Sequence, residues 1–157
     1  VEKISINSST IDNPELIKNA AEVFGSQSVI VSIDVKTNFW NKYDVYTHGG
    51  TKKHKINPTD HARNMEALGA GEILLTSINN EGTWKGYDYT IVKTIASSVS
   101  IPVISNGGAG KIEHMSYAVN NAGASAVALG SMVVYQGQDL GVLINFPDKC
   151  ELERALN

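Results

Sequence analysis

The sequence predicts an α/β fold built around a parallel sheet, and three features predict it. Short apolar, β-branched runs alternate along the chain with segments of helical periodicity. The run at residues 29–33 is apolar on both faces, which is typical of a strand in a parallel sheet covered by helices. The segments 69–73 and 123–127 both lead from a helix end into a strand. This faint internal repeat favours parallel strands joined by right-handed crossovers.

Each element has its own local signal. Proline at positions 14 and 58 suits the first turn of a helix, and Gly25 suits a helix end. Strands are predicted at residues 2–7, 29–33, 72–76, 101–104 and 125–129. Helices are predicted at residues 14–24, 58–68, 87–98, 112–121 and 148–156, with Asp148 as the cap of the last one. A polar turn is predicted at residues 8–13, a hairpin within residues 36–55, and a short additional strand at residues 142–146.

The length sets a limit on the architecture. The chain has 157 residues, whereas a closed (β/α)₈ barrel takes about 250. We therefore expect a single domain over residues 1–157 with an open sheet, whose bare edges favour self-association. The chain has no initiator methionine and begins in strand-like alternation, so we expect it to be cut from something longer.

Composition excludes several classes of function. A net charge of −3 without a long basic run gives no reason to expect a nucleic-acid partner. The single Cys150 excludes an internal disulfide framework and is consistent with a reducing cytoplasm. No apolar run reaches the length of about 18 residues that a membrane span needs. No spacing of histidines and acids matches a metal site, so we predict neither metal nor cofactor.

Two turns are candidates for phosphate binding. The strand at 101–104 runs into Ser105-Asn106-Gly107-Gly108-Ala109-Gly110 and then into a helix, an arrangement that presents backbone N–H groups to an anion. The next strand ends in Gly130-Ser131, so that two neighbouring turns suit one phosphate. Taken alone, the glycine turn fits a purely structural role equally well.

In such folds the ligand lies at the carboxyl ends of the strands. The candidate residues there are small, polar or acidic: Asn7, Ser8, Asp34, Thr76, Asn79, Glu81, Gly82, Asn106, Gly107, Gly108, Gly130 and Ser131. Asp34 follows an apolar run, so burial is expected to raise its pKa and suit it to carry a proton. The alternative for Asp34 is a carboxylate that caps a loop. Glu81 is either part of a phosphate-facing turn or simply solvated.

Six segments, in order and at family spacing, resemble the cyclase subunit of imidazole glycerol phosphate synthase, a barrel of histidine biosynthesis. They are residues 3–7, 31–34, 69–78, 81–83, 86–88 and 105–111. The resemblance covers nearly the whole chain. It implies a partial (β/α)₈ barrel with a parallel sheet, made of about strands four to eight with their helices.

The resemblance also implies a function, site residues and partners. The family is a lyase that uses ammonia from a glutaminase subunit to convert a phosphorylated substrate into imidazole glycerol phosphate. Asp34 matches the second of its two catalytic carboxylates, and the first has no counterpart, so we expect this chain alone to be inactive. Asn7 and Ser8 match one phosphate site, while Thr76 and Asn106 line the cleft. The second phosphate site is matched by Gly82, Gly108, Gly130 and Ser131.

Two departures leave alternatives open. Asn79 stands where the family usually has aspartate, and the segments 47–53 and 141–147 resemble a paralogous branch. That branch supports an amidotransferase that makes acetamidino sugars for surface polysaccharide, with the barrel handling ammonia. A further alternative is a non-catalytic, phosphate-binding half-barrel that self-associates.

Overall fold

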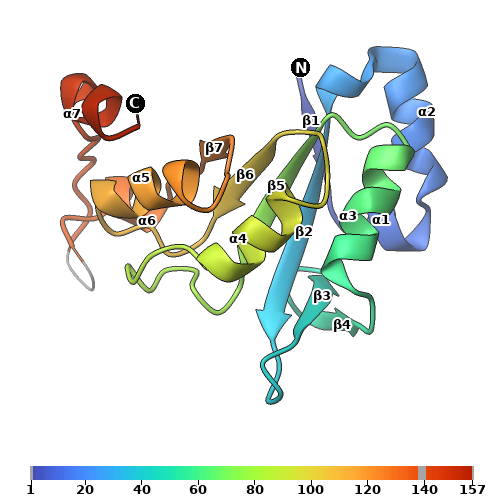
Figure 1. The fold of residues 1–157 in the computed structure, drawn as a ribbon, viewed down its shortest axis with the longest axis horizontal. Helices are drawn as coiled ribbons and strands as arrows, with labels where there is room; N and C mark the ends of the chain where they lie inside the picture. Colours follow the sequence, from blue (N-terminus) through green and yellow to red (C-terminus); the bar gives the residue numbers. More distant parts are fainter. Residues whose placement is uncertain (1, 138–140, 157) are drawn as a thin grey trace.

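The computed structural model describes residues 2–137 and 141–156. Its strands are β1 (Ile4–Ile6), β2 (Val29–Thr37), β3 (Tyr43–Thr47), β4 (Lys52–His54), β5 (Glu72–Ser77), β6 (Val103–Asn106) and β7 (Ala126–Val127). Its helices are α1 (Ser9–Asp12), α2 (Glu15–Phe24), α3 (Pro58–Ala67), α4 (Tyr89–Ala96), α5 (Ile112–Asn120), α6 (Ser131–Val134) and α7 (Lys149–Leu156). A 3₁₀ turn, η1 (Ser26–Ser28), precedes β2. Figure 1 shows their arrangement.

The sheet has a parallel core with an added hairpin. The parallel pairs are β1 with β2, β2 with β5, β5 with β6, and β6 with β7. The β3–β4 hairpin extends the sheet by pairing β3 antiparallel to the second half of β2. The five parallel strands and the hairpin predicted from the sequence are therefore confirmed.

The two faces of the sheet differ in burial. Along β2, alternate side chains from Val29 to Val35 are buried, whereas the intervening Ile30, Ser32 and Asp34 are only half-buried. Helices α3 and α4 lie in front of the sheet in Figure 1, and α3 contacts β2 while α4 contacts β6. The half-buried face is the one that a barrel turns inward, as the predicted partial barrel requires. Over these residues β1 and β7 do not pair, so the sheet is an open, partial barrel.

Three local predictions need correction. β2 runs on to Thr37, so Asp34 lies within the strand, because pairing with β3 extends it. Residues 142–146 form no strand: Val142 makes one isolated bridge to Tyr135, and no further strand lies beside the segment over the described residues. The polar stretch after β1 contains the short helix α1.

Side chains cap the starts of α3 and α7, and the cap of α7 by Asp148 was predicted from the sequence. The Asn57 side chain accepts a hydrogen bond from the Thr59 N–H at 2.8 Å, just ahead of Pro58 at the start of α3. Asp148 accepts one from the Cys150 N–H at 2.8 Å at the start of α7. In the part of the chain described, no helix combines the length and the apolar character needed to cross a membrane.

Candidate active site

Three of the predicted residues form a row across neighbouring strands. Asp34 on β2 is in register with Thr76 on β5, which is in register with Asn106 on β6. All three are half-buried on the open face of the sheet. The Asn106 Nδ2 donates a hydrogen bond to the Thr76 Oγ1 at 3.1 Å. The register of a parallel sheet thus brings together side chains that are far apart in the sequence.

The carboxyl group of Asp34 is the titratable group of this row. Burial raises its pKa, and hydrogen bonds from Ser32, Thr76 and Asn7 only partly oppose that effect. The Ser32 hydroxyl lies 3.4 Å from the Asp34 Oδ1. A carboxyl group with a raised pKa both accepts and releases a proton closer to neutral pH, which is what acid–base chemistry requires.

The Asn7–Ser8 turn follows β1 and lies beside Asp34. The Asn7 Nδ2 donates to the Ser32 carbonyl at 3.1 Å, which holds this side chain against β2. The Ser8 hydroxyl donates to the Asn7 Oδ1 at 3.2 Å and accepts from the His48 N–H at 3.1 Å. The hairpin is therefore connected to this turn through Ser8.

The other candidate phosphate site is formed by two glycine turns, the first of which contains Gly107 and Gly108 after β6. Both have positive φ angles, +93° and +104°. A Cβ at Gly108 would lie 2.2 Å from the Gly86 carbonyl oxygen, and one at Gly107 would lie 2.8 Å from the Ser77 carbonyl oxygen. Close packing of the β5–α4 loop thus already requires glycine at both positions, independently of any ligand.

Glu81 lies between the two predicted glycine turns. A Cβ at Gly107 would be 3.1 Å from one Glu81 carboxylate oxygen, and a Cβ at Gly130 would be 3.9 Å from the other. Gly130 and Ser131 begin α6, and Gly82 is exposed with open space around it. A phosphate in this position would meet the like charge of the exposed Glu81 side chain.

Asn79 does not join the row. Its Oδ1 accepts hydrogen bonds from the Thr37 N–H at 2.9 Å and the Thr37 hydroxyl at 3.2 Å, at the end of β2. The neighbouring Asn80, which the sequence analysis did not single out, shapes the loop instead. It accepts from the Ser77 hydroxyl at 3.2 Å and donates to the Gly86 carbonyl at 2.8 Å. Because Asn79 and Asn80 are identical neighbours in a polar loop, the sequence could not predict which of them binds Thr37 and which binds within the loop.

Two further residues behind the Asn7–Ser8 turn were also missed. The Thr10 hydroxyl lies 2.6 Å from the Asn7 carbonyl oxygen and 3.2 Å from the His61 Nε2. Both side chains are buried. His61 lies on α3 next to the apolar Ala62 and Met65, so its burial was foreseeable, but its contact with Thr10 was not.

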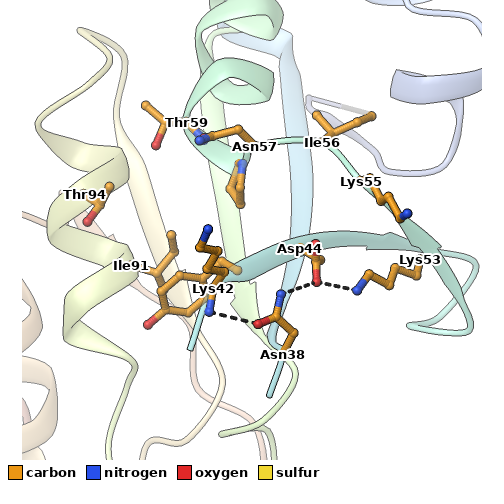
Figure 2. Close-up of a pocket in the computed structure, with 12 residues that line it drawn as sticks. Asn38, Lys42, Asp44, Lys53, Lys55, Ile56, Asn57, Thr59, Ile91 and Thr94 are labelled. Carbon is orange, nitrogen blue, oxygen red and sulfur yellow. Dashed lines mark hydrogen bonds and ion pairs between the residues drawn. The ribbon is translucent and has the colours of Figure 1, made fainter. Parts of the chain in front are cut away.

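A separate cavity of about 640 Å³ lies between the hairpin and helices α3 and α4, and none of the predicted site residues lines it. Figure 2 shows Asp44 within it, bound by the Lys53 ammonium at 2.6 Å and by the Asn38 Nδ2 at 3.0 Å. These contacts, first the one with Lys53, lower the pKa of Asp44. Across residues 2–137 and 141–156, no group of three His, Cys, Asp or Glu side chains is placed to hold a metal.

Comparison with known proteins agrees with this architecture. Residues 1–139 match the family described as histidine biosynthesis protein. The chain is 42% identical over 98% of its length to a Pseudomonas aeruginosa protein named putative imidazole glycerol phosphate synthase subunit hisF2. It is 44% identical over 92% of its length to the imidazole glycerol phosphate synthase subunit HisF of Thermococcus gammatolerans. A Prochlorococcus marinus protein of that same name is 45% identical over 84% of the chain.

The chain spans only part of each relative: 61%, 57% and 52% of the three proteins in the order given. The family match, in contrast, extends over most of this chain. Family members are barrel proteins, and the open parallel sheet described above corresponds to part of such a barrel. The chain belongs to the histidine biosynthesis protein family.

Proposed function

We propose that this chain supplies the carboxyl-terminal part of a cyclase-type lyase, the barrel subunit of imidazole glycerol phosphate synthase. The complete barrel takes ammonia from a glutaminase subunit and a bis-phosphorylated ribulosyl substrate, and forms imidazole glycerol phosphate in the cytoplasm. Asp34 transfers protons, Thr76 and Asn106 line the cleft, and the two sets of turns bind the two phosphate groups. The chain alone is inactive, because the first carboxylate of the acid–base pair, the partner of Asp34, is not part of it.

The observation that carries this proposal is the position of Asp34 between the two sets of turns. Its carboxyl group lies in register with Thr76 and, one strand further, Asn106. Burial raises its pKa, as a proton-transferring carboxyl requires. The Asn7–Ser8 turn is beside it, and the turns at Gly107 and Gly130 follow the strands on its other side.

The test is ammonia-dependent turnover of the bis-phosphorylated ribulosyl substrate by a complete barrel. The barrel combines this chain with the amino-terminal part that its relatives have, as wild type and as Asp34→Asn. We expect turnover in the wild type and a loss of about a thousandfold or more in the variant, because asparagine cannot transfer the proton. Turnover that is equal in both would exclude Asp34 from the chemistry.

The paralogous amidation function is the second candidate, and the position of Asn79 favours it. Asn79 is neutral and bound to Thr37, so the β5–α4 loop contributes only Glu81 as an acid near the glycine turns. The likeness to a protein named hisF2 agrees with a second, divergent copy of the barrel. A folded complete barrel that leaves the ribulosyl substrate unchanged, and whose gene does not rescue a histidine auxotroph, would favour this function.

Self-association of the chain is the third candidate. The strands β1 and β7 are the edges of the parallel core, and Ile4 on β1 is exposed. A second copy could cover such edges and the half-buried face. A concentration-independent monomer in light scattering would argue against it.

A further inference from the structure

His61 joins helix α3 to the Asn7–Ser8 turn, although 51 residues separate it from its partner Thr10. The His61 side chain is 5% exposed and that of Thr10 is 3% exposed. The His61 Nε2 lies 3.2 Å from the Thr10 Oγ1. Water therefore has little access to either group, and over the described residues the His61 ring makes its hydrogen bond with Thr10.

The direction of the hydrogen bonds follows from the single proton of the threonine hydroxyl. The Thr10 Oγ1 lies 2.6 Å from the Asn7 carbonyl oxygen, which can only accept, so the hydroxyl proton is donated there. The Thr10 oxygen must then accept from His61. The imidazole therefore carries a proton on Nε2, and the chain of donors runs from His61 through Thr10 to Asn7.

These hydrogen bonds from His61 through Thr10 to Asn7 fix the orientation of one peptide group. The Asn7 carbonyl oxygen accepts both the Thr10 hydroxyl at 2.6 Å and the Thr10 N–H at 3.0 Å. In a trans peptide the carbonyl and the following N–H point in opposite directions, so fixing the Asn7 carbonyl also fixes the direction of the Ser8 N–H. A backbone N–H held in place is the kind of donor that binds a phosphate group.

We propose that His61 is a positioning residue for anion binding, which acts through Thr10 to orient the Ser8 N–H. It does not touch the ligand. The inference rests on the proposed function in one respect only, namely that the Asn7–Ser8 turn binds a phosphate group. The orientation of the turn can be tested without that assumption.

The test compares His61→Gln with His61→Phe in the full chain. Glutamine offers an amide N–H at about the reach of Nε2, whereas phenylalanine fills the space and donates nothing. Inorganic phosphate is titrated while the Ser8 amide is followed by NMR. We expect His61→Gln to bind within about twofold of wild type and His61→Phe to bind about five- to tenfold more weakly, the loss of one hydrogen bond.

A second variant and a ligand-free measurement keep the test decisive. Thr10→Val removes the same link from its other end, so it should weaken binding as His61→Phe does, and it replaces that variant if His61→Phe does not fold. Equal phosphate affinity in His61→Gln and His61→Phe, or in wild type and Thr10→Val, would overturn the positioning role.

If wild type itself shows no phosphate-dependent shift at Ser8, the proposed phosphate site fails. The role of His61 is then judged from the Asn7 carbonyl and Ser8 amide shifts without phosphate. Shifts that His61→Phe or Thr10→Val moves, and that His61→Gln retains, support the positioning role. Shifts that are the same in all of these variants overturn it.

Discussion

The Asn7–Ser8 turn and the turn at Gly107 and Gly108, one from each candidate phosphate site, are built in different ways. The Asn7–Ser8 turn is held by side-chain hydrogen bonds: the Thr10 hydroxyl donates to the Asn7 carbonyl and contacts His61, and the Ser8 hydroxyl accepts from the His48 backbone N–H. The turn at Gly107 and Gly108 is held by close backbone packing against the β5–α4 loop. The first turn is therefore vulnerable to the loss of a side chain, and the second to the addition of one.

The largest expected effect is that of adding a methyl group to the glycine turn. Gly108→Ala would place a Cβ 2.2 Å from the Gly86 carbonyl oxygen at a φ of +104°, so backbone has to move. We expect a loss of about 3 kcal/mol in the free energy of unfolding, measured by urea titration. Gly49→Ala is the matched control: its φ is also positive, +64°, but nothing lies near its Cβ. It should cost only about 1 kcal/mol, and equal losses would contradict the packing argument.

The next effect concerns the negative charge of Glu81, which lies between the glycine turns. Replacing Glu81 by glutamine removes the carboxylate between Gly107 and Gly130. We expect inorganic phosphate to bind these turns about fivefold more tightly at low salt, as removal of a like charge near 4 Å predicts for a solvated site. Chemical-shift titration of the Gly107 and Ser131 amides measures it. Unchanged affinity at these amides would mean that Glu81 does not oppose the anion, and Glu113→Gln on α5 is the control.

Asp34 lies between the two turns, and its ionised carboxylate is expected to lower the free energy of unfolding at neutral pH. Its pKa is raised by burial, so the folded state holds the proton more tightly than the unfolded state does. The stability that the protonated carboxyl group contributes at low pH is therefore lost as the pH rises from the pKa of Asp34 in the unfolded state through its pKa in the folded state. Asp34→Asn should therefore be more stable than wild type at pH 7 and equal to it near pH 3, by urea midpoint. A variant less stable than wild type at pH 7 would contradict this.

The smallest expected effect is on the pH dependence of the free energy of unfolding, through His61 behind the Asn7–Ser8 turn. Burial, and then the nearby His54, lower the pKa of His61. The unfolded state therefore binds a proton more readily, and stability falls as pH drops below the ordinary histidine value of about 6.5. His61→Gln should flatten the stability profile between pH 5 and 6.5, measured by urea titration at each pH. A profile with an unchanged slope would show that other groups set it.

Much of the fold could be predicted because it depends on local signals. The β-branched run of β2, Pro58 at the start of α3 and the Asp148 cap of α7 each act through neighbouring residues. What could not be predicted depends on partners distant in sequence. β2 extends past Asp34 because β3 pairs with it. Among the residues that the structure describes, no strand lies beside residues 142–146 despite their apolar composition.

The candidate site divides in the same way. The row of Asp34, Thr76 and Asn106 followed from the rule that parallel strands present their carboxyl ends together, and the sheet register brings them side by side. The contacts of Asn79 with Thr37 and of His61 with Thr10 follow from no periodicity or motif. The glycine motif was located correctly as a turn after a strand, but its packing role depends on the Gly86 carbonyl, a group that no sequence pattern reveals.

The half-buried face of the sheet has a practical consequence for work with this chain. Ile30, Leu74 and Ile104 lie on that face, and Leu143, Ile144 and Phe146 are exposed near the end of the chain. Fluorescent dyes such as ANS brighten on apolar surface of this kind, which is the usual sign of a molten globule. Here a bright dye signal would accompany a well-packed core, so near-ultraviolet circular dichroism is the better criterion of whether a preparation is folded.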